Sequence, residues 1–118
     1  RSALADAAVS MALSTKAVAI VVLTESGKTA EAVSHLRSNL PIFALTESPT
    51  VQRQLQLFHA VVPLITKFDR VPEVSIETAL NVVRKQKLVK NGEKIVIISD
   101  TKTVKGRAHA VHIRTIGE

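Results

Sequence analysis

The sequence predicts an α/β protein, a three-layer α/β/α sandwich around a five-stranded mixed sheet. Two apolar runs, Ala17–Leu23 and Lys94–Ile98, are continuous rather than alternating, which is typical of strands buried on both faces of a parallel sheet. Helical patterns separate the earlier apolar runs, and this alternation indicates parallel strands joined by crossover helices. No helical pattern separates the last two strands, which are therefore expected to pair antiparallel.

The first predicted helix, Ser2–Thr15, is rich in alanine. Its apolar residues recur at helical spacing on one face, and they are Leu4, Ala7, Ala8, Met11 and Ala12. Small side chains allow a helix to lie close to a sheet. We therefore expect this helix to pack directly on the sheet that contains the next segment, the strand Ala17–Leu23.

The second helix is predicted at Thr29–Ser38, because Ala32, Val33 and Leu36 fall on one helical face. Asn39 ends this helix before a proline, and the next strand is predicted at Ile42–Leu45.

A four-residue repeat marks two similar turns. The sequence LTES occurs at Leu23–Ser26 and again at Leu45–Ser48, and each copy closes a strand and opens a helix. In the second copy Ser48 is the expected N-cap and Pro49 the first residue of a helix over Pro49–Phe58. Two successive strand–helix units imply parallel neighbouring strands, with both turns at the same edge of the sheet.

The third strand is predicted at His59–Ile65. It contains Pro63, which cannot donate a ladder hydrogen bond, so this strand is expected at an edge of the sheet. A polar connection at residues 66–72 leads to a long helix, Glu73–Val89, which is supported by Ile76, Leu80 and Val83 at helical spacing.

The last part of the chain is predicted to contain two strands and a loop. The Asn-Gly pair at residues 91–92 indicates a turn into the strand Lys94–Ile98. Ser99–Arg107 is polar and basic, and it is predicted to be a loop. The final strand, Ala108–Ile116, alternates in polarity as an edge strand does.

Composition indicates a globular protein. The chain has 118 residues, of which 46% are hydrophobic and 22% charged, and we expect one domain over residues 1–118. No apolar run reaches the ~18 residues of a membrane span, and no secretory signal is recognisable. Cysteine is absent, which excludes disulfides and zinc–thiolate sites. We expect a cytoplasmic protein with no membrane partner. Because the chain starts without Met inside a helical pattern, we also expect it to be a fragment of a longer chain.

The net charge of +6 is unevenly distributed. Residues 1–83 contain seven basic and seven acidic side chains, whereas residues 84–118 contain nine basic and three acidic ones. A basic end favours an anionic partner. Nucleic acid is disfavoured, because Trp and Tyr are absent and the three Phe lie outside the basic end, so stacking platforms are missing there. A sugar phosphate and an ordinary solvated basic surface remain the two interpretations.

The turn Thr24–Thr29, read TESGKT, is the main functional signal. It lies at the predicted carboxyl end of a buried strand and at a helix N-terminus, where open α/β sheets place ligands and free N–H groups favour anions. Its hydroxyls, its glycine and Lys28 suit a phosphate cradle. The alternative is an ordinary strand-to-helix turn in which Ser26 or Thr29 is the N-cap.

The sequence predicts neither catalytic nor metal-binding residues. Carboxylates are scattered without the spacing of metal ligands. His109 and His112 fall on opposite faces of a predicted strand, which makes them a poor metal pair. His35 and His59 are interpreted as structural or surface residues. No nucleophile-elbow pattern is present. The chain is therefore expected to perform no chemistry by itself.

Three stretches carry a resemblance to a known family. They are AIVVLTESGKTAEAVSHLRSNLPIFALTESP at residues 19–49, QRQLQLFHAVVPLI at residues 52–65, and the Asn91-Gly92 turn that leads into a strand. In this order they resemble the C-terminal α/β domain of pyruvate kinases, across essentially the whole chain. The turn LTESGKT followed by an alanine-rich helix is the most specific part. The resemblance implies the strand order 3-2-1-4-5 with the last strand antiparallel.

The resemblance also implies a regulatory site. In allosteric members the turn after the first strand holds a phosphate of a sugar bisphosphate activator, and in some branches a late Val-Lys-Gly loop supplies positive charge in place of the common Gly/Ser/Thr-rich form. Carried over to this sequence, the implied effector-binding residues are Thr24, Glu25, Ser26, Gly27, Lys28, Thr29, Lys105, Gly106 and Arg107. The domain has no cofactor of its own, whereas Mg²⁺ and K⁺ are expected for the parent enzyme, which transfers a phosphoryl group between phosphoenolpyruvate and ADP. The implied partners are the remainder of that chain and further copies in a tetramer.

Two other functions stay open at this stage. One is a free-standing phosphoanion-binding module. The other is a purely structural assembly domain without effector binding, which the carboxylate of Glu25 and the absence of Trp favour, because many activated members use a Trp for the second phosphate and a carboxylate repels a phosphate.

Overall fold

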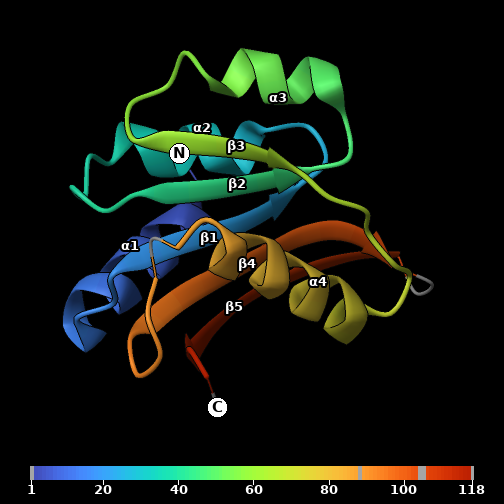
Figure 1. Cartoon of the computed structure of the whole chain (residues 1–118). Helices are drawn as coiled ribbons and strands as arrows, with labels where there is room; N and C mark the ends of the chain where they lie inside the picture. Colours follow the sequence, from blue (N-terminus) through green and yellow to red (C-terminus); the bar gives the residue numbers. More distant parts are fainter. Residues whose placement is uncertain (1, 88, 104–105, 118) are drawn as a thin grey trace.

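The computed structural model describes residues 2–87, 89–103 and 106–117, with the side chains of residues 102–108 excepted. In this part of the chain, helices and strands alternate until the last two strands, which are consecutive (Figure 1). The elements are α1 (Ala3–Thr15), β1 (Ala19–Thr24), α2 (Lys28–His35), β2 (Ile42–Thr46), α3 (Pro49–Leu55), β3 (Val61–Ile65), α4 (Pro72–Lys85), β4 (Lys94–Thr103) and β5 (Gly106–Thr115).

The strands form one sheet in the order β3-β2-β1-β4-β5. The pairs β1–β2, β1–β4 and β2–β3 are parallel, and β4–β5 is antiparallel. This order and the reversed last strand confirm the predicted fold. Pro63 lies in β3 at one edge of the sheet, as expected for a residue that cannot donate to a ladder on both sides.

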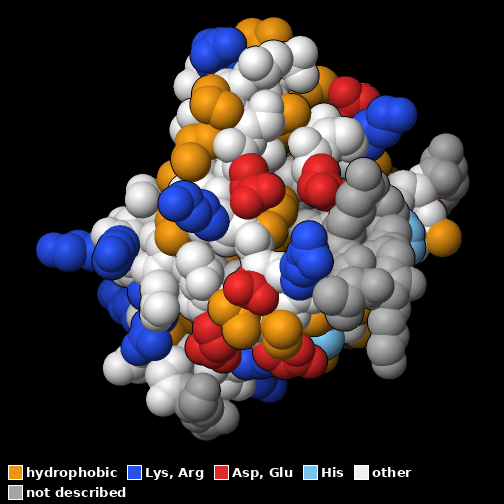
Figure 2. Space-filling model, turned by 90° about the vertical axis from the view of Figure 1, so that its right-hand side faces the viewer, with side chains coloured by type: hydrophobic (Ala, Val, Ile, Leu, Met, Phe, Trp, Pro, Cys, Tyr) orange, Lys and Arg blue, Asp and Glu red, His pale blue; other side chains and the backbone are white. Residues whose placement is uncertain are grey.

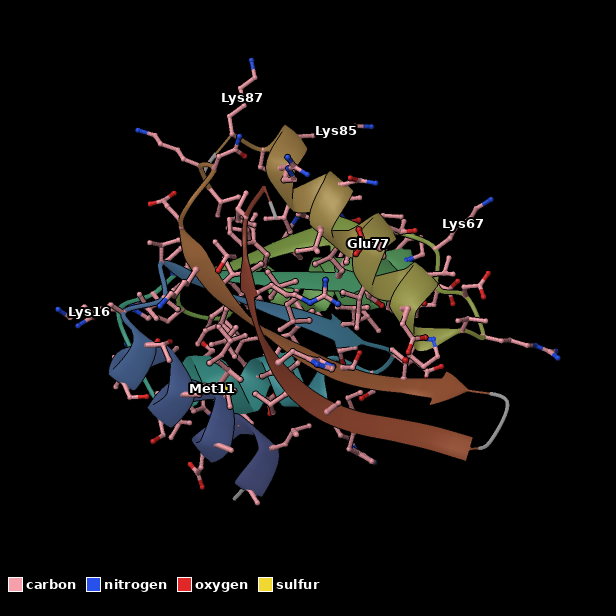
Figure 3. All side chains as sticks on the ribbon, turned by 90° about the horizontal axis from the view of Figure 1, so that it is seen from below. Met11, Lys16, Lys67, Glu77, Lys85 and Lys87 are labelled. Atoms are coloured by element: carbon pink, nitrogen blue, oxygen red, sulfur yellow. The ribbon has the colours of Figure 1, made fainter. Side chains whose placement is uncertain are left out.

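Helices cover both faces of the sheet and give it three layers. One face of the sheet packs against α1, α2 and α3, and the other packs against α4. Figure 3 shows α1 and α4 on opposite sides of the sheet. Every residue of β1 and β2 is buried, because both strands lie between the layers. Their continuous apolar sequences are the consequence of this position.

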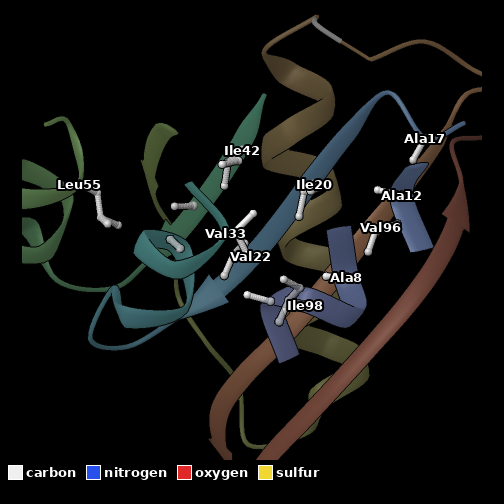
Figure 4. Close-up of a cluster of buried hydrophobic side chains, with 13 residues drawn as sticks. Ala8, Ala12, Ala17, Ile20, Val22, Val33, Ile42, Leu55, Val96 and Ile98 are labelled. Atoms are coloured by element: carbon white, nitrogen blue, oxygen red, sulfur yellow. The ribbon is translucent and has the colours of Figure 1, made fainter. Parts of the chain in front are cut away.

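Alternate residues of the central strands feed two separate hydrophobic clusters. Ile20 and Val22 of β1 join the cluster under α1 and α2, whereas Val21 and Leu23 join the cluster under α4. Figure 4 shows the first cluster, in which Ala8 and other small residues of α1 lie against the strands. A fully buried Val, Leu or Ile contributes roughly 1.5–3 kcal/mol, so the two clusters are the main source of stability.

The alanine-rich helix α1 packs as predicted, with one difference in its face. Ala5, Ala8 and Ala12 have no exposed surface, whereas Ala7, which the sequence analysis placed on the inner face, is exposed. The fully buried residues of α1 are spaced by three and then four positions, and Leu4, Val9 and Met11 pack beside them against the same cluster. Ser2 caps the helix by accepting a hydrogen bond from the N–H of Ala5 at 3.1 Å.

Two expected boundaries are wrong. Ser99–Arg107 was expected to be a loop, but β4 continues to Thr103 and β5 already begins at Gly106. The antiparallel ladder pairs backbone groups whatever the side chains are, so the polar residues extend the hairpin. The long helix ends at Lys85 rather than Val89, because Lys87 has a positive φ of 59°.

Three other elements differ from their predicted bounds by two or three residues at one end. The helices α2 and α3 end about one turn before the predicted ends at Ser38 and Phe58, and β3 starts at Val61 rather than His59. Arg37, just after the end of α2, and Ala60, just before the start of β3, have positive φ values. Such backbone conformations interrupt a helix or strand whatever the pattern of apolar residues is.

The tight fit of α1 on the sheet gives a test. Substitution Ala8→Leu inserts three carbons where no exposed surface remains, and we expect it to lower the free energy of unfolding by roughly 1–3 kcal/mol in urea denaturation. Ala7→Leu is the matched control on the exposed side of the same helix, with an expected change within about 0.5 kcal/mol. Equal effects of the two substitutions would contradict the packing of α1.

Candidate functional site

The Thr24–Thr29 turn lies at the carboxyl edge of the parallel strands, in the middle of the sheet. Thr24, the last residue of β1, pairs with Asp100 of β4, and the neighbouring strand β2 ends beside it. Gly27 is the N-cap of α2. Figure 2 shows the molecule from this side, and the visible acidic and basic side chains are interspersed on it. The turn therefore occupies the place where open α/β sheets bind ligands.

Hydrogen bonds within the turn fix its backbone. The N–H of Gly27 donates to Oγ1 of Thr24 at 2.9 Å, and the N–H of Lys28 donates to Oγ of Ser26 at 3.3 Å. Gly27 has a φ of 87°, a left-handed conformation that favours glycine. The predicted N-cap, Ser26 or Thr29, is wrong, because Gly27 takes the cap position and makes no side-chain cap bond.

Thr29 does not point to solvent. Its hydroxyl donates to Oδ2 of Asp100 on β4 at 2.7 Å, and the residue is only 7% exposed. The other carboxylate oxygen, Oδ1 of Asp100, lies 3.3 Å from Nδ1 of His109 on β5. The sheet register explains this contact, because Asp100 pairs with Thr24 on one side and with His109 on the other. A carboxylate is thus part of the site.

The side chains of the predicted site diverge in three directions. Ser26, Gly27 and Lys28 line a cleft of about 240 Å³ toward α3, together with residues that include Gln54 and Leu57. Glu25 lines a second cleft of about 200 Å³ with Thr46–Ser48, which belong to the second copy of the repeat, and with Phe68. Thr29 turns toward Asp100. The structure thus brings the six residues into one turn but does not aim them at one point.

The second half of the predicted site belongs to the hairpin between β4 and β5. Gly106 and Arg107 are the first residues of β5, paired with Thr103 and Lys102 of β4. Lys105 lies outside the described residues, and so does the side chain of Arg107. Their role as phosphate ligands therefore stays a prediction.

Asp100 is the site residue that sequence reasoning missed. It was assigned to a polar loop, although it follows the buried run Lys94–Ile98 by two residues. Since the carboxyl ends of parallel strands meet at one edge, polar residues just after two neighbouring strands are expected to lie together. Applied to β4, this rule would have placed Asp100 beside the Thr24–Thr29 turn.

The four histidines lie in three parts of the fold, in α2, in the connection before β3 and in β5. His35 packs edge-to-face on Phe58, with ring centroids 5.9 Å apart, and the carbonyl of His59 accepts a hydrogen bond from Ser34 at 2.7 Å. His109 and His112 pair with Asp100 and Ile97 and so fall on opposite faces of β5. Within the described residues, no group of three or more His, Cys, Asp or Glu is arranged to hold a metal ion.

A helix that crosses a bilayer must be long and predominantly apolar, and the helices α1 to α4 can be compared with this requirement. Over the described part of the chain, none of them combines the length and the apolar character that crossing a bilayer requires.

The conformation of Gly27 gives a test. A Cβ at this position would lie 3.1 Å from Cγ1 of Val51 and 3.2 Å from Cδ2 of Leu55, and φ is 87°. Gly92 is a matched control, since its φ is 90° but nothing lies within 4 Å of a built Cβ. We expect Gly92→Ala to lower the free energy of unfolding by about 1 kcal/mol through backbone strain alone.

Gly27→Ala is expected to lower the free energy of unfolding by roughly 1 kcal/mol more than the control does, because the side chains of Val51 and Leu55 must also move to make room for the Cβ. Urea denaturation of both variants measures the difference. Equal losses would show that the contact with α3 does not constrain the turn.

Comparisons with known proteins agree with the fold. The family described as pyruvate kinase, alpha/beta domain, matches residues 2–114. The chain is 35% identical over 97 residues to a pyruvate kinase of Lactococcus lactis, covering 82% of this chain and 19% of that protein. It is 31% identical over 115 residues to a pyruvate kinase of Dictyostelium discoideum, covering 97% of this chain and 23% of that protein.

A solved structure gives the same result. The pyruvate kinase of Cryptosporidium parvum in complex with ADP superposes with a TM-score of 0.85 at 28% identity, covering 96% of this chain and 23% of that one. The chain thus spans about a fifth of the length of these relatives. With the predicted topology, the family match and the structural match in agreement, the chain belongs to the pyruvate kinase C-terminal α/β domain family.

Proposed function

We propose that the chain is the regulatory and assembly domain of a pyruvate kinase and that it binds a sugar-phosphate effector, of the fructose bisphosphate class, at the Thr24–Thr29 turn. The observation that carries this proposal is the position of the turn, which joins the carboxyl end of the central strand to the N-terminus of α2. The four N–H groups that begin a helix have no intrahelical acceptor. In α2 those of Gly27 and Lys28 donate within the turn, and those of Thr29 and Ala30 favour an anion.

The exposed residues of the turn supply the rest of the chemistry. Ser26 and Lys28 are exposed, and both line the cleft toward α3. A phosphate held there accepts hydrogen bonds from the hydroxyl and from backbone N–H groups and is attracted by the ammonium group of Lys28. Lys105, Gly106 and Arg107 remain part of the proposal as ligands on the hairpin side. Binding of one anion by both segments would link α2 to the β4–β5 hairpin.

The edge of the sheet supports the assembly role. The order β3-β2-β1-β4-β5 leaves β3 and β5 at the two edges. β3 has five residues and contains Pro63, whereas β5 has ten residues. Figure 3 shows β5 along the outer side of the sheet. A long edge strand can pair with another chain, and Ile113 of β5 is 42% exposed. We infer that β5 contributes to contacts between copies, in a tetramer of the parent enzyme.

The proposal places the chemistry outside this chain. The parent enzyme would convert phosphoenolpyruvate and ADP to pyruvate and ATP, with Mg²⁺ and K⁺ bound in the remainder of the longer chain. The domain, spanning residues 1–118, would act on this reaction by changing how copies assemble when the effector binds. A cytoplasmic location is part of the proposal, although one relative, isozyme G of Nicotiana tabacum, is chloroplastic.

A second function has an observation of its own in its favour. The hydroxyl of Thr29 is bound to the Asp100 carboxylate, and Glu25 adds a further carboxylate to the same turn. These groups favour a purely structural assembly domain in which the turn binds no effector. The full open reading frame separates the proposed function from a third candidate, a free-standing phosphoanion-binding module. A catalytic domain encoded in the same reading frame would exclude that candidate.

Thermal unfolding with added ligands tests effector binding. Fructose 1,6-bisphosphate, ribose 5-phosphate and inorganic phosphate are each added at millimolar concentration. A ligand at ~100 times its Kd stabilises the native state by roughly 2.7 kcal/mol, which raises the unfolding midpoint of a domain this size by several degrees. Lys28→Gln should lose most of this shift. Lys85→Gln, the same change on α4, should keep it.

The absence of a shift with every ligand would favour the structural role over effector binding. A shift that Lys28→Gln and Lys85→Gln reduce equally would place the anion elsewhere on the basic surface rather than at the turn.

Sedimentation velocity tests the assembly role. We expect the chain to self-associate with rising concentration and expect Ile113→Lys to weaken this association about tenfold or more, because a lysine charge would be desolvated in the contact. Ile65→Lys on β3 is the matched control, since Ile65 is 43% exposed and β3 forms the opposite edge of the sheet. Equal weakening by both variants would contradict an interface at β5.

A further inference from the structure

One carboxylate joins three parts of the chain at the proposed effector site. Asp100 accepts the Thr29 hydroxyl at 2.7 Å through Oδ2, and its Oδ1 lies 3.3 Å from Nδ1 of His109. The side chain of Asp100 is 17% exposed, and that of His109 is 57% exposed. The contact with Thr29 spans 71 positions in the sequence, so the fold rather than local structure creates it.

The contact matters because Asp100 and a phosphate compete for the same chemistry. Both are anions that accept short hydrogen bonds from hydroxyl donors. A hydroxyl has a single hydrogen, so Thr29 donates either to Asp100 or to a bound anion. In addition, two negative charges a few ångströms apart repel each other, by an amount that depends strongly on exposure to water.

We propose that Asp100 acts as an internal anion of the turn. In the absence of ligand its carboxylate accepts the hydrogen bond of the Thr29 hydroxyl, and this contact sets how tightly the turn binds phosphate. The proposal rests on the proposed effector function and names a residue that controls it. Binding of a phosphate at Thr29 requires the hydroxyl to rotate away from Asp100. His109 acts as a positioning residue, because its contact with the second carboxylate oxygen holds Asp100 toward α2.

A merely structural role for Asp100 makes a different prediction. If the carboxylate only ties β4 to α2, its replacement by an amide lowers stability and leaves phosphate affinity unchanged. If it competes with the ligand, the same replacement raises affinity, because the amide carries no charge and accepts a weaker hydrogen bond. Affinity and stability therefore separate the two roles.

The test is a titration with inorganic phosphate, and in parallel with fructose 1,6-bisphosphate, followed by the backbone amide resonances of Gly27, Lys28 and Thr29. We expect Asp100→Asn to bind roughly tenfold more tightly than the unmodified chain, because it weakens the competing acceptor for the Thr29 hydroxyl and removes one nearby like charge. Glu77→Gln is the matched control. Glu77 pairs with Arg114 at 3.4 Å, and Arg114 lies five positions beyond His109 on β5.

A double-mutant cycle shows whether Asp100 acts through Thr29. Thr29→Val removes the hydroxyl at nearly constant volume, and in this background Asp100→Asn is expected to raise affinity by no more than about threefold. A full tenfold gain in the Thr29→Val background would overturn the competition for the hydroxyl and leave only charge repulsion. Thermal unfolding of each variant verifies folding, and Asp100→Ser replaces Asp100→Asn if the latter is unfolded.

The outcomes distinguish this inference from the function on which it rests. Equal affinities of the unmodified chain and Asp100→Asn would overturn the inference while the effector site stands. Binding by neither protein, with amide resonances of the turn unchanged at tens of millimolar phosphate, would overturn both. A gain that Glu77→Gln reproduces would attribute the effect to net charge and would also overturn the inference.

Discussion

The burial of β1 between β2 and β4 is the constraint on which the rest of the structure depends. All six residues of β1 are buried, and they point alternately to the cluster under α1 and α2 and to the cluster under α4. A shift of the register by one residue would exchange the two sets of side chains, so the register is strongly specified. The same register fixes where β1 ends, and therefore where the turn that begins α2 lies.

The pairing of β1 with β4 positions both the candidate site and the carboxylate of Asp100 beside it. Parallel β1 and β4 bring Thr24 and Asp100 side by side, and antiparallel β5 adds His109 to Asp100. A turn suited to anions thus has a negative side chain built beside it. Under the proposed function, such an arrangement would make effector affinity adjustable by one residue of β4 without changes to the turn itself. The long edge strand β5 carries both His109 and the surface proposed for assembly.

Much of the fold could be predicted because its signals are local. Continuous apolar runs identified β1 and β4, the repeated LTES turn identified parallel neighbours, and Pro63 identified an edge. The errors share a cause as well. The hairpin extends through polar residues because backbone pairing with β5 stabilises them, and α4 ends early at residues whose backbone turns left-handed. Neither effect is visible in a pattern of apolar side chains.

The sequence by itself determined the α/β class, the elements and the turn at Thr24–Thr29, because periodicity and turn chemistry act over a few residues. Only the tertiary structure decided what the turn contacts. It makes Gly27 rather than a hydroxyl residue the N-cap, directs Glu25 and Lys28 into different clefts, and joins Thr29 to Asp100 across 71 positions. These contacts depend on which strands lie side by side, and strand order is a property of the whole packed sheet rather than of any segment.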